Sequence, residues 1–289
     1  MIWLVGNKGM LGSEVEGLLR ERGMRHVATD RDVDITKPES ITRFFGSLGA
    51  EQPEWIINCA AYTAVDLAED ERDAAFAVNA EGPLNLAYAA QRTGAVLVHI
   101  STDYVFSGEK GADYEEDDES APVNTYGKSK LEGEMAVRGV VERHFIIRSA
   151  WMYGKNGKNF VSTMLRFFRE RQEVRVVCDQ TGNPTYAPDL AQILLMIASR
   201  RERRYGTYHF TNNGSASWYE FARAIYEDAR GCGVLEHDVD ILPITSREYP
   251  TRARRPQNSC LATGKIKCML AVPGRGWRDA LRDFIGGFS

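Results

Sequence analysis

The sequence lacks the features that mark several large classes of protein. It contains five cysteines in 289 residues, and none of them forms a C-x-x-C pair. Because disulfide frameworks and zinc sites depend on paired or closely spaced cysteines, neither is expected. No apolar run approaches the ~18 residues of a membrane span. The first residues lack the charged region and long apolar run of a secretory signal. We therefore expect a cytoplasmic location and no membrane partner.

A strong excess of one charge is absent too. The 36 Lys and Arg residues and the 40 Asp and Glu residues give a formal net charge of −4. This balance provides no electrostatic reason to expect nucleic-acid binding. The five histidines are scattered along the chain, and no carboxylate pattern identifies a metal ligand. We therefore expect no nucleic-acid partner and assign no metal ligand.

The first half of the sequence alternates short apolar runs with helical patterns. Two helical patterns, 13–23 and 73–94, lie between apolar runs. Strands that alternate with helices predict βαβ units, and therefore an α/β fold with a doubly wound parallel Rossmann sheet. The predicted strands are 1–6, 26–30, 54–60, 95–102 and 144–150.

The pattern loosens after about Trp151. Helical patterns follow at 159–172, 189–199 and 218–229, and the tail is irregular and rich in Arg and Pro. We predict a dinucleotide-binding domain over 1–150 and a smaller α/β substrate-binding domain over 151–289. We also expect the chain to return to the first domain around 174–200, with the strand-like run 174–179 extending the main sheet.

A glycine-rich loop follows the first predicted strand. The run "VGNKGMLG" places Gly6, Gly9 and Gly12 between that strand and the first predicted helix. Glycines at this spacing allow a tight turn and let backbone N–H groups approach a pyrophosphate at a helix N-terminus. A plain glycine turn has the same composition, but the strand–loop–helix context favours a dinucleotide.

The end of the second predicted strand bears on the choice of dinucleotide. Asp30 lies there, 18 residues after Gly12, where a carboxylate can accept hydrogen bonds from a ribose 2′-OH and favour NADH. Arg31 follows directly and can contact a 2′-phosphate, which favours NADPH. The residues leave both cofactors open. Asp34 and Ile35 come next and are candidates for the adenine pocket.

Three polar residues form a candidate catalytic group. Thr102 ends the fourth predicted strand, and ligands of open α/β sheets bind at the carboxyl ends of strands. Tyr126 and Lys130 are four residues apart, so on a helix they project from one face. Tyr-x-x-x-Lys alone is a loose pattern that also describes surface pairs. Behind a glycine loop, the three residues suit carbonyl reduction, with a phenol as proton donor and an ammonium that lowers its pKa from about 10.

An ordered set of motifs resembles one family over nearly the whole chain. The chain is similar to the dTDP-4-dehydrorhamnose reductase family, a group of extended short-chain dehydrogenases/reductases. The downstream motifs belong to this subgroup rather than to the superfamily at large. The motifs are NCAAYTAVD (58–66), STDYVF (101–106), YGKSKLEGE (126–134), RSAWMYG (148–154), DQTGNPT (179–185) and RPQNSCL (255–261).

The resemblance implies an activity and a set of roles. The activity is NAD(P)H-dependent reduction of the C4 keto group of dTDP-4-dehydro-L-rhamnose to dTDP-L-rhamnose, with NADPH or NADH as cofactor. It makes Thr102, Tyr126 and Lys130 the catalytic residues, with Lys130 also holding the nicotinamide ribose. Members are described as Mg²⁺-dependent dimers, but no Mg²⁺ ligand or dimer surface is assignable from the residues. The implied cofactor residues also include Met10, Leu11, Ala60, Ala61 and Tyr62, and the implied substrate residues are Val65, Asp103, Tyr104, Trp151, Arg255 and Asn258.

Other functions are compatible with parts of this pattern. A 4,6-dehydratase of the same superfamily carries Asp-Glu after the strand-end Thr, whereas Asp103 and Tyr104 stand here. A 4-epimerase uses the same Tyr and Lys with a retained NAD, although 101–106 and 255–259 favour a reductase. Regulatory subunits of methionine adenosyltransferase keep such a fold as a binding module without catalysis. Trp151 could instead be a core aromatic at a domain junction, although the family match favours a role in stacking on the sugar.

Overall fold

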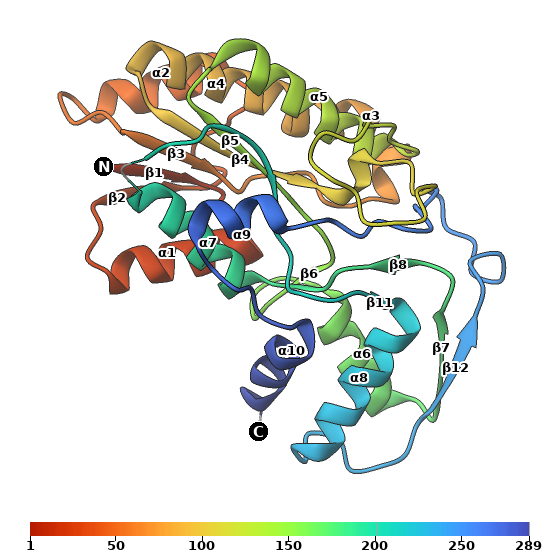
Figure 1. Ribbon diagram of the computed structural model, residues 1–289. Helices are drawn as coiled ribbons and strands as arrows, with labels where there is room; N and C mark the ends of the chain where they lie inside the picture. The colour runs from red at the N-terminus through yellow and green to blue at the C-terminus, as the bar shows by residue number, and fades with distance from the viewer. Residues whose placement is uncertain (201, 289) are drawn as a thin grey trace.

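A six-stranded parallel sheet forms the centre of the computed structural model, which describes residues 1–200 and 202–288 (Figure 1). The strand order is β10-β5-β4-β3-β1-β2. All neighbouring strands in this sheet run parallel, so their carboxyl ends meet at one edge. The strands are β1 (Ile2–Val5), β2 (His26–Thr29), β3 (Trp55–Asn58), β4 (Val96–Thr102), β5 (His144–Ser149) and β10 (Gly206–His209).

Helices cover both faces of this sheet, which confirms the predicted doubly wound fold (Figure 1). One face is covered by α2 (Pro38–Ser47), α4 (Gly82–Thr93) and α5 (Thr125–Val140). The other face is covered by α1 (Met10–Glu21), α7 (Ala187–Ser199) and α9 (Gly264–Leu270). A short helix α3 (Arg72–Phe76) leads into α4 through a π-helical turn, η2 (Ala77–Glu81).

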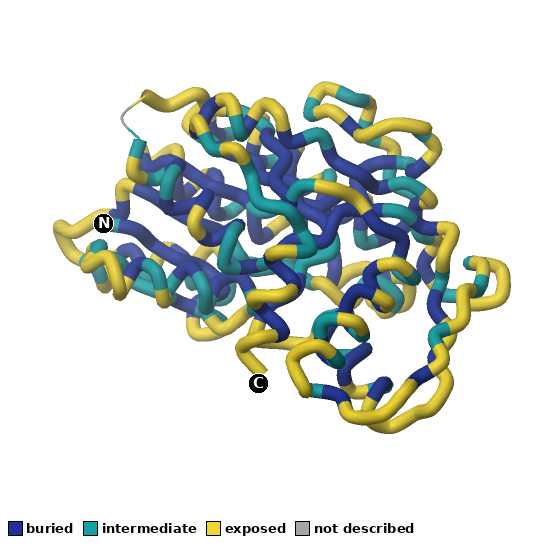
Figure 2. The backbone as a smooth tube through the Cα atoms, turned by 60° about the horizontal axis from the view of Figure 1, so that its bottom comes forward, coloured by how far each residue is buried: buried dark blue, intermediate teal, exposed yellow. Residues whose placement is uncertain are grey.

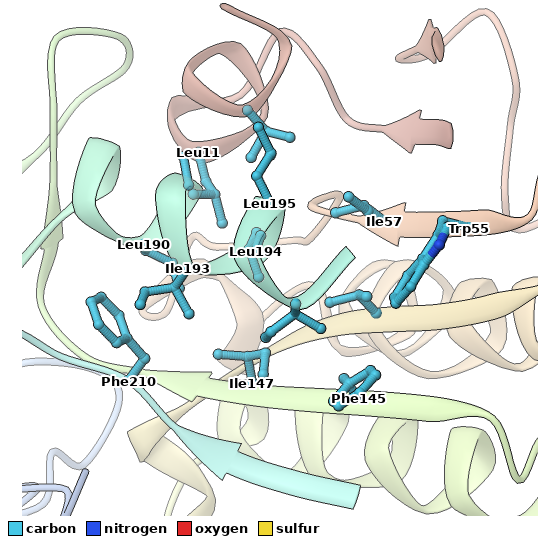
Figure 3. Close-up of a cluster of buried hydrophobic side chains, with 14 of the residues drawn as sticks. Leu11, Trp55, Ile57, Phe145, Ile147, Leu190, Ile193, Leu194, Leu195 and Phe210 are labelled. Atoms are coloured by element: carbon cyan, nitrogen blue, oxygen red, sulfur yellow. The ribbon is translucent and has the colours of Figure 1, made fainter. Parts of the chain in front are cut away.

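The main core lies between the sheet and helices α1 and α7. Leu190, Leu194 and Leu195 of α7 gather with Leu11 of α1 against the strand side chains, among them Ile57 (Figure 3). A second cluster fills the opposite face, beneath α2, α4 and α5. Figure 2 shows the buried stretches running through the middle of the molecule, with exposed loops around them. Such two-sided burial explains why these strands read as continuous apolar runs.

The chain returns to the main sheet differently from the prediction. The expectation that 174–179 extends this sheet is wrong, because β7 (Glu173–Val177) pairs in parallel with β12 (Asp240–Ile244). Along β7, Glu173 and Arg175 are exposed and alternate with buried valines, so the strand has only one apolar face. A strand within a sheet covered on both sides would bury those charges. Helix α7 and strand β10 are the elements that return.

The remaining elements pack around a core of their own. Helices α6 (Phe160–Glu170), α8 (Trp218–Gly231) and α10 (Trp277–Gly286) share one apolar cluster. The tail that looked irregular thus contains both α9 and α10. The division into domains at about residue 150 stays a prediction. Two short strand pairings complete the sheets described: β6 (Met152–Tyr153) pairs with β9 (Thr185–Tyr186), and β8 (Thr181–Gly182) pairs with β11 (Ala216–Ser217). Two 3₁₀ turns, η1 (Leu67–Glu69) and η3 (Asp103–Val105), lie in the first half of the chain.

Within residues 1–200 and 202–288, none of the helices has the length and apolar character needed to cross a bilayer.

Candidate active site

The glycine loop has the geometry of a phosphate cradle. Gly6 has φ +79°, and a Cβ there would lie 2.7 Å from the backbone nitrogen of Ala60. A Cβ on Gly12 would collide with the Gly6 carbonyl oxygen. Gly9 is the N-cap of α1 and provides no side-chain cap, so the first N–H groups of the helix, at Met10, Leu11 and Gly12, point out of its end. The loop therefore fits the pyrophosphate of a dinucleotide.

Asp30 and Arg31 lie at the surface beyond β2. Asp30 is half-buried, and its backbone N–H donates to the Asp32 carboxylate at 2.7 Å. Arg31 is exposed. Neither side chain is buried against the protein, so the competition between a 2′-hydroxyl and a 2′-phosphate partner is still open at this position.

Asp34 and Ile35 are occupied by the chain's own structure. The Asp34 carboxylate accepts hydrogen bonds from the Thr36 N–H (3.0 Å) and hydroxyl (2.7 Å), and pairs with Lys37 at 3.2 Å. Ile35 is buried, and its side chain packs where a Cβ on Gly82 would lie. Their role in an adenine pocket stays a prediction, and both residues also shape the turn before α2.

A buried amide that the sequence analysis overlooked connects two parts of the site. Asn79, in the π-helical turn η2, is 0% exposed. Its side-chain oxygen accepts from the Tyr62 N–H at 2.9 Å, and its nitrogen donates to the Tyr62 carbonyl and the Ser129 hydroxyl, each at 3.0 Å. Asn79 thus ties the Ala60–Tyr62 segment to the helix that carries Tyr126 and Lys130. The signal in the sequence that could have identified Asn79 was an amide side chain on the buried side of the predicted helix 73–94.

The first turn of α5 fixes Tyr126. Asn124 is the N-cap, and its side chain accepts from the Gly127 N–H at 2.8 Å. The Glu69 carboxylate accepts from both the N–H and the hydroxyl of Thr125, each at 2.8 Å. These caps satisfy donors that a helix N-terminus leaves unpaired. They hold Tyr126 beside the end of β4.

Thr102 and Tyr126 meet at that strand end. Thr102 is 6% exposed, and its hydroxyl donates to the Asp103 carboxylate at 2.9 Å. Burial raises the pKa of Tyr126, and the hydrogen bond with Thr102 opposes that increase. The expectation that the pKa of Tyr126 lies below its ordinary value is therefore wrong for the protein alone, because loss of solvation dominates. The phenol is held in its protonated form.

Lys130 lies one turn further along α5 and is fully inside the protein. It is 2% exposed, and its Nζ donates to the Ile100 carbonyl at 2.7 Å. Burial lowers the pKa of Lys130 to about 8, while Glu134 and Cys59 oppose that decrease. The ammonium also lies near Cys59, the residue before Ala60. Thr102, Tyr126 and Lys130 are therefore connected to the glycine loop through the segment that follows β3.

A buried ion pair supports the base of this helix. Glu134 is 0% exposed, and its two carboxylate oxygens accept from Arg148 at 2.9 and 2.8 Å. Burial acts to raise the pKa of Glu134, but Arg148, together with Ser101 and Arg138, lowers it below the ordinary value. Glu134 is thus an ionised partner of Arg148 on β5. The pair joins the catalytic helix to the sheet.

The predicted substrate residues fall into two groups, of which one surrounds Tyr126. Asp103 is 3% exposed, and its Oδ2 has no hydrogen-bond partner in the described part of the chain. Burial raises the pKa of Asp103 to about 6. The ring of Tyr104 meets that of Tyr126 edge-on at 5.9 Å. Arg255 donates to the Tyr104 hydroxyl at 3.2 Å and pairs with Asp66 at 2.7 Å.

The contacts of the other group, Val65, Asn258 and Trp151, do not involve Tyr126. Val65 is half-buried just before η1. The Asn258 amide donates to the carbonyls of Lys110 and Ala112 at 2.7 and 2.9 Å, so this side chain holds the 107–114 loop. Trp151 lies two residues after the end of β5 and stacks on Trp218. The structure thus brings Asp103, Tyr104 and Arg255 together and gives Asn258 a structural partner.

A parallel dinucleotide sheet, with Thr at the end of its fourth strand and a Tyr-x-x-x-Lys helix beside it, defines the class of extended short-chain dehydrogenases/reductases. The family described as RmlD substrate binding domain matches residues 1–289. The chain belongs to this family, that of the dTDP-4-dehydrorhamnose reductases. The resemblance inferred from the motifs is therefore confirmed.

Individual relatives cover nearly the whole chain. The dTDP-4-dehydrorhamnose reductase of Aggregatibacter actinomycetemcomitans is 41% identical over 286 residues, covering 97% of this chain and 96% of that protein. The dTDP-4-dehydrorhamnose reductase of Escherichia coli (strain K12) is 37% identical over 290 residues, covering 97% and 95%. A crystal structure of dTDP-4-dehydrorhamnose reductase from Bacillus anthracis in complex with NADP aligns with a TM-score of 0.90 and 39% identity, covering 98% of this chain and 97% of that one.

The structure adds no candidate metal site. Over the ranges 1–200 and 202–288, no three His, Cys, Asp or Glu side chains gather in a way that could hold an ion.

Proposed function

We propose that this protein reduces the C4 keto group of dTDP-4-dehydro-L-rhamnose to give dTDP-L-rhamnose. The observation that carries the proposal is the meeting of Thr102, Tyr126 and Lys130 at the carboxyl end of β4, next to the segment that abuts the glycine loop. Membership of the reductase family supports the same activity. A binding module without catalysis would have no need of a buried phenol, hydroxyl and ammonium at this place.

NADPH is the cofactor that we propose. The Bacillus anthracis relative was solved with NADP, and the exposed Arg31 follows β2 where a 2′-phosphate would lie. NADH stays the alternative because Asp30 precedes that arginine. The bound dinucleotide supplies the hydride. The N–H groups of Met10, Leu11 and Gly12 would hold its pyrophosphate, and Ala60 to Tyr62 would lie beside its nicotinamide half.

Tyr126 is the proposed proton donor. Its phenol gives a proton to the C4 oxygen as the C4 carbon accepts a hydride, so a ketone becomes an alcohol and a phenolate remains. The raised pKa keeps the donor protonated before the reaction. Lys130 stabilises the phenolate through its charge, and Thr102 supplies a second hydrogen bond to the C4 oxygen. Water then returns the proton to the phenolate.

Six side chains are the proposed substrate contacts. The unpartnered Oδ2 of Asp103 is an acceptor for a sugar hydroxyl. Tyr104 and Arg255 border the same space, and arginine suits the diphosphate of the substrate. Trp151 and Val65 provide apolar surface. For Asn258, we propose support of the neighbouring loop in addition to a substrate role.

The test is oxidation of NADPH, and separately of NADH, with dTDP-4-dehydro-L-rhamnose generated in place. Wild-type protein should oxidise NADPH faster, and Tyr126→Phe should reduce kcat by about 10²–10⁴-fold. The control is dinucleotide binding, which Tyr126→Phe should retain because the glycine loop is untouched. Full activity in Tyr126→Phe would refute the role of the phenol. Tight NADPH binding by the wild type without turnover would favour an epimerase or a binding module instead.

Location and assembly are also proposed from the family. A reductase that uses NADPH and a nucleotide sugar is proposed to work in the cytoplasm and to form a homodimer. Sedimentation of the purified protein would test the second point directly, since a monomer would contradict it.

A further inference from the structure

Trp151 has a conformation that its surroundings must enforce. Its backbone φ is +43°, in a region that residues other than glycine seldom occupy. Strained residues of this kind persist only where neighbouring groups determine them, and they gather at functional sites. Trp151 lies two residues after the end of β5, at the sheet edge where ligands of such folds bind. The groups that hold this residue therefore bear on the site.

Trp218 covers one face of the Trp151 indole. The two ring centroids are 3.4 Å apart and the planes differ by 5°. Trp218 is the first residue of α8, whose N-terminus is fixed by a capping box between Ser217 and Glu220. Phe160, which belongs to the same apolar cluster, packs against Trp218 with 4.6 Å between the ring centroids. The stacking partner is thus itself held rigidly.

Gly182 restrains the same indole at a second point. A Cβ on Gly182 would lie 2.5 Å from both Nε1 and Cε2 of Trp151, so only glycine fits there. The ladder β8–β11 pairs Gly182 with Ala216 and Thr181 with Ser217, which places Gly182 and Trp218 in one unit. The Thr185 N–H also donates to the Trp151 carbonyl at 3.2 Å. Gly182 of β8 therefore restrains the ring of Trp151, and Thr185 of β9 restrains its backbone.

We propose that Trp218 is a positioning residue that determines specificity for the sugar, by stacking on Trp151 and fixing the part of its indole left for the substrate. This inference rests on the proposed function. Because Trp218 occupies one face of the ring and Gly182 lies against its Nε1 and Cε2 atoms, the substrate meets only the part of the indole that these two residues leave free. A fixed aromatic surface of this size suits the apolar face of a deoxyhexose. The nucleoside diphosphate alone lacks that sugar and so lacks this contact.

The experiment measures two dissociation constants by titration calorimetry, one for dTDP-L-rhamnose and one for dTDP. Their ratio isolates the contribution of the sugar. Trp218→Leu should reduce the ratio roughly tenfold, the size of one lost aromatic contact. Trp218→Phe should restore part of the ratio. Gly182→Ala should abolish the contribution of the sugar by displacing the indole. The dTDP affinity should stay unchanged in all three.

Trp277→Leu is the matched control. Trp277 belongs to the same aromatic cluster as Trp218, half-buried like it, but contacts Phe221 at 5.6 Å rather than Trp151. This variant should lose stability and keep the ratio. The ultraviolet circular dichroism couplet of the stacked indoles should vanish in Trp218→Leu and survive in Trp277→Leu. Equal ratios in wild type and Trp218→Leu, with reductase turnover intact, would overturn the inference and leave the proposed function standing. A wild type that binds neither nucleotide would overturn both.

Discussion

At the scale of single residues, the site is made of groups that folding has taken out of water. Asp103, Tyr126 and Lys130 are all in this position, and in each case burial is the main influence on the pKa. The direction is the one that disfavours the charged form, upward for the two acids and downward for the amine. Burial of such groups reduces the stability of the folded chain, and groups with pKa values shifted in this way are typical of functional sites.

Asp103 allows this cost to be measured. Its pKa of about 6 lies above the ordinary carboxyl value near 4, so the folded protein holds the proton more tightly than the unfolded chain. Folding is therefore penalised when the group is ionised, and stability should fall as the pH rises from about 4 to 6. Asp103→Asn removes that penalty. It should raise the free energy of unfolding by up to roughly 3 kcal/mol at pH 8, and by little at pH 4.

Urea unfolding at both pH values checks this prediction, and the rate of NADPH oxidation should drop in the same variant. Asp118→Asn is a useful comparison, because the pKa of Asp118 is lowered by its hydrogen bond to Lys110. Its substitution should not stabilise the protein at any pH. An Asp103→Asn protein less stable than wild type at pH 8 would show that the carboxylate gains more from Thr102 and Ser259 than it loses by burial.

At the scale of elements, the loop and helix that follow β1 depend on one close contact. A Cβ on Gly12 would collide with the Gly6 carbonyl, whereas a Cβ on Gly17, further along α1, meets nothing within 4 Å. Gly12→Ala should therefore cost about 1–3 kcal/mol of misfit. If this free energy is lost from cofactor binding, the Kd for NADPH should rise roughly 10- to 100-fold. Gly17→Ala should leave that Kd unchanged and stabilise the helix by about 0.5–1 kcal/mol.

NADPH fluorescence titrations of the two variants measure this difference. A Gly12→Ala protein that binds NADPH as the wild type does would mean that the loop can move aside, and the cradle would not be essential.

The sequence predicts the elements that obey simple periodicity. The buried strands from β1 to β5 read as apolar runs, and α1, α6 and α8 carry apolar stripes, so all of them could be found. The motifs likewise indicated Thr102, Tyr126 and Lys130. The position of β7 could not be found, because a short run of valines separated by Arg175 fits either a main sheet or a side pairing. Only the tertiary partner, β12, decides.

Side-chain partners escaped the prediction for a related reason. Asn79, Glu69 and Trp218 act on the site through contacts between segments 50 or more residues apart, and single-sequence patterns do not report such contacts. The sign of the pKa shift at Tyr126 was missed for the same cause. Spacing places Lys130 one turn away, but the degree of burial depends on the whole fold.

At the scale of the whole molecule, the two halves of the chain are interleaved. Helix α7 lies beyond residue 150, yet Leu190, Leu194 and Leu195 belong to the core under the main sheet (Figure 3). Strand β10 then adds to the edge of that sheet, beside β5. After α8 the chain crosses back again to place α9 in the same core (Figure 1). The second half therefore cannot lose its structure without opening the core under the main sheet.

This interleaving predicts that damage in either core is felt at the cofactor site. Leu194→Ala, in the core under the main sheet, and Leu281→Ala, in the core of α6, α8 and α10, remove equally buried side chains. Each should lower the free energy of unfolding by about 2–5 kcal/mol. Urea unfolding followed by circular dichroism and by NADPH release should show one transition in both variants. If Leu281→Ala moved only the circular dichroism transition and left NADPH release at the wild-type midpoint, the halves would be independent domains, and a boundary near residue 150 would describe how the protein unfolds.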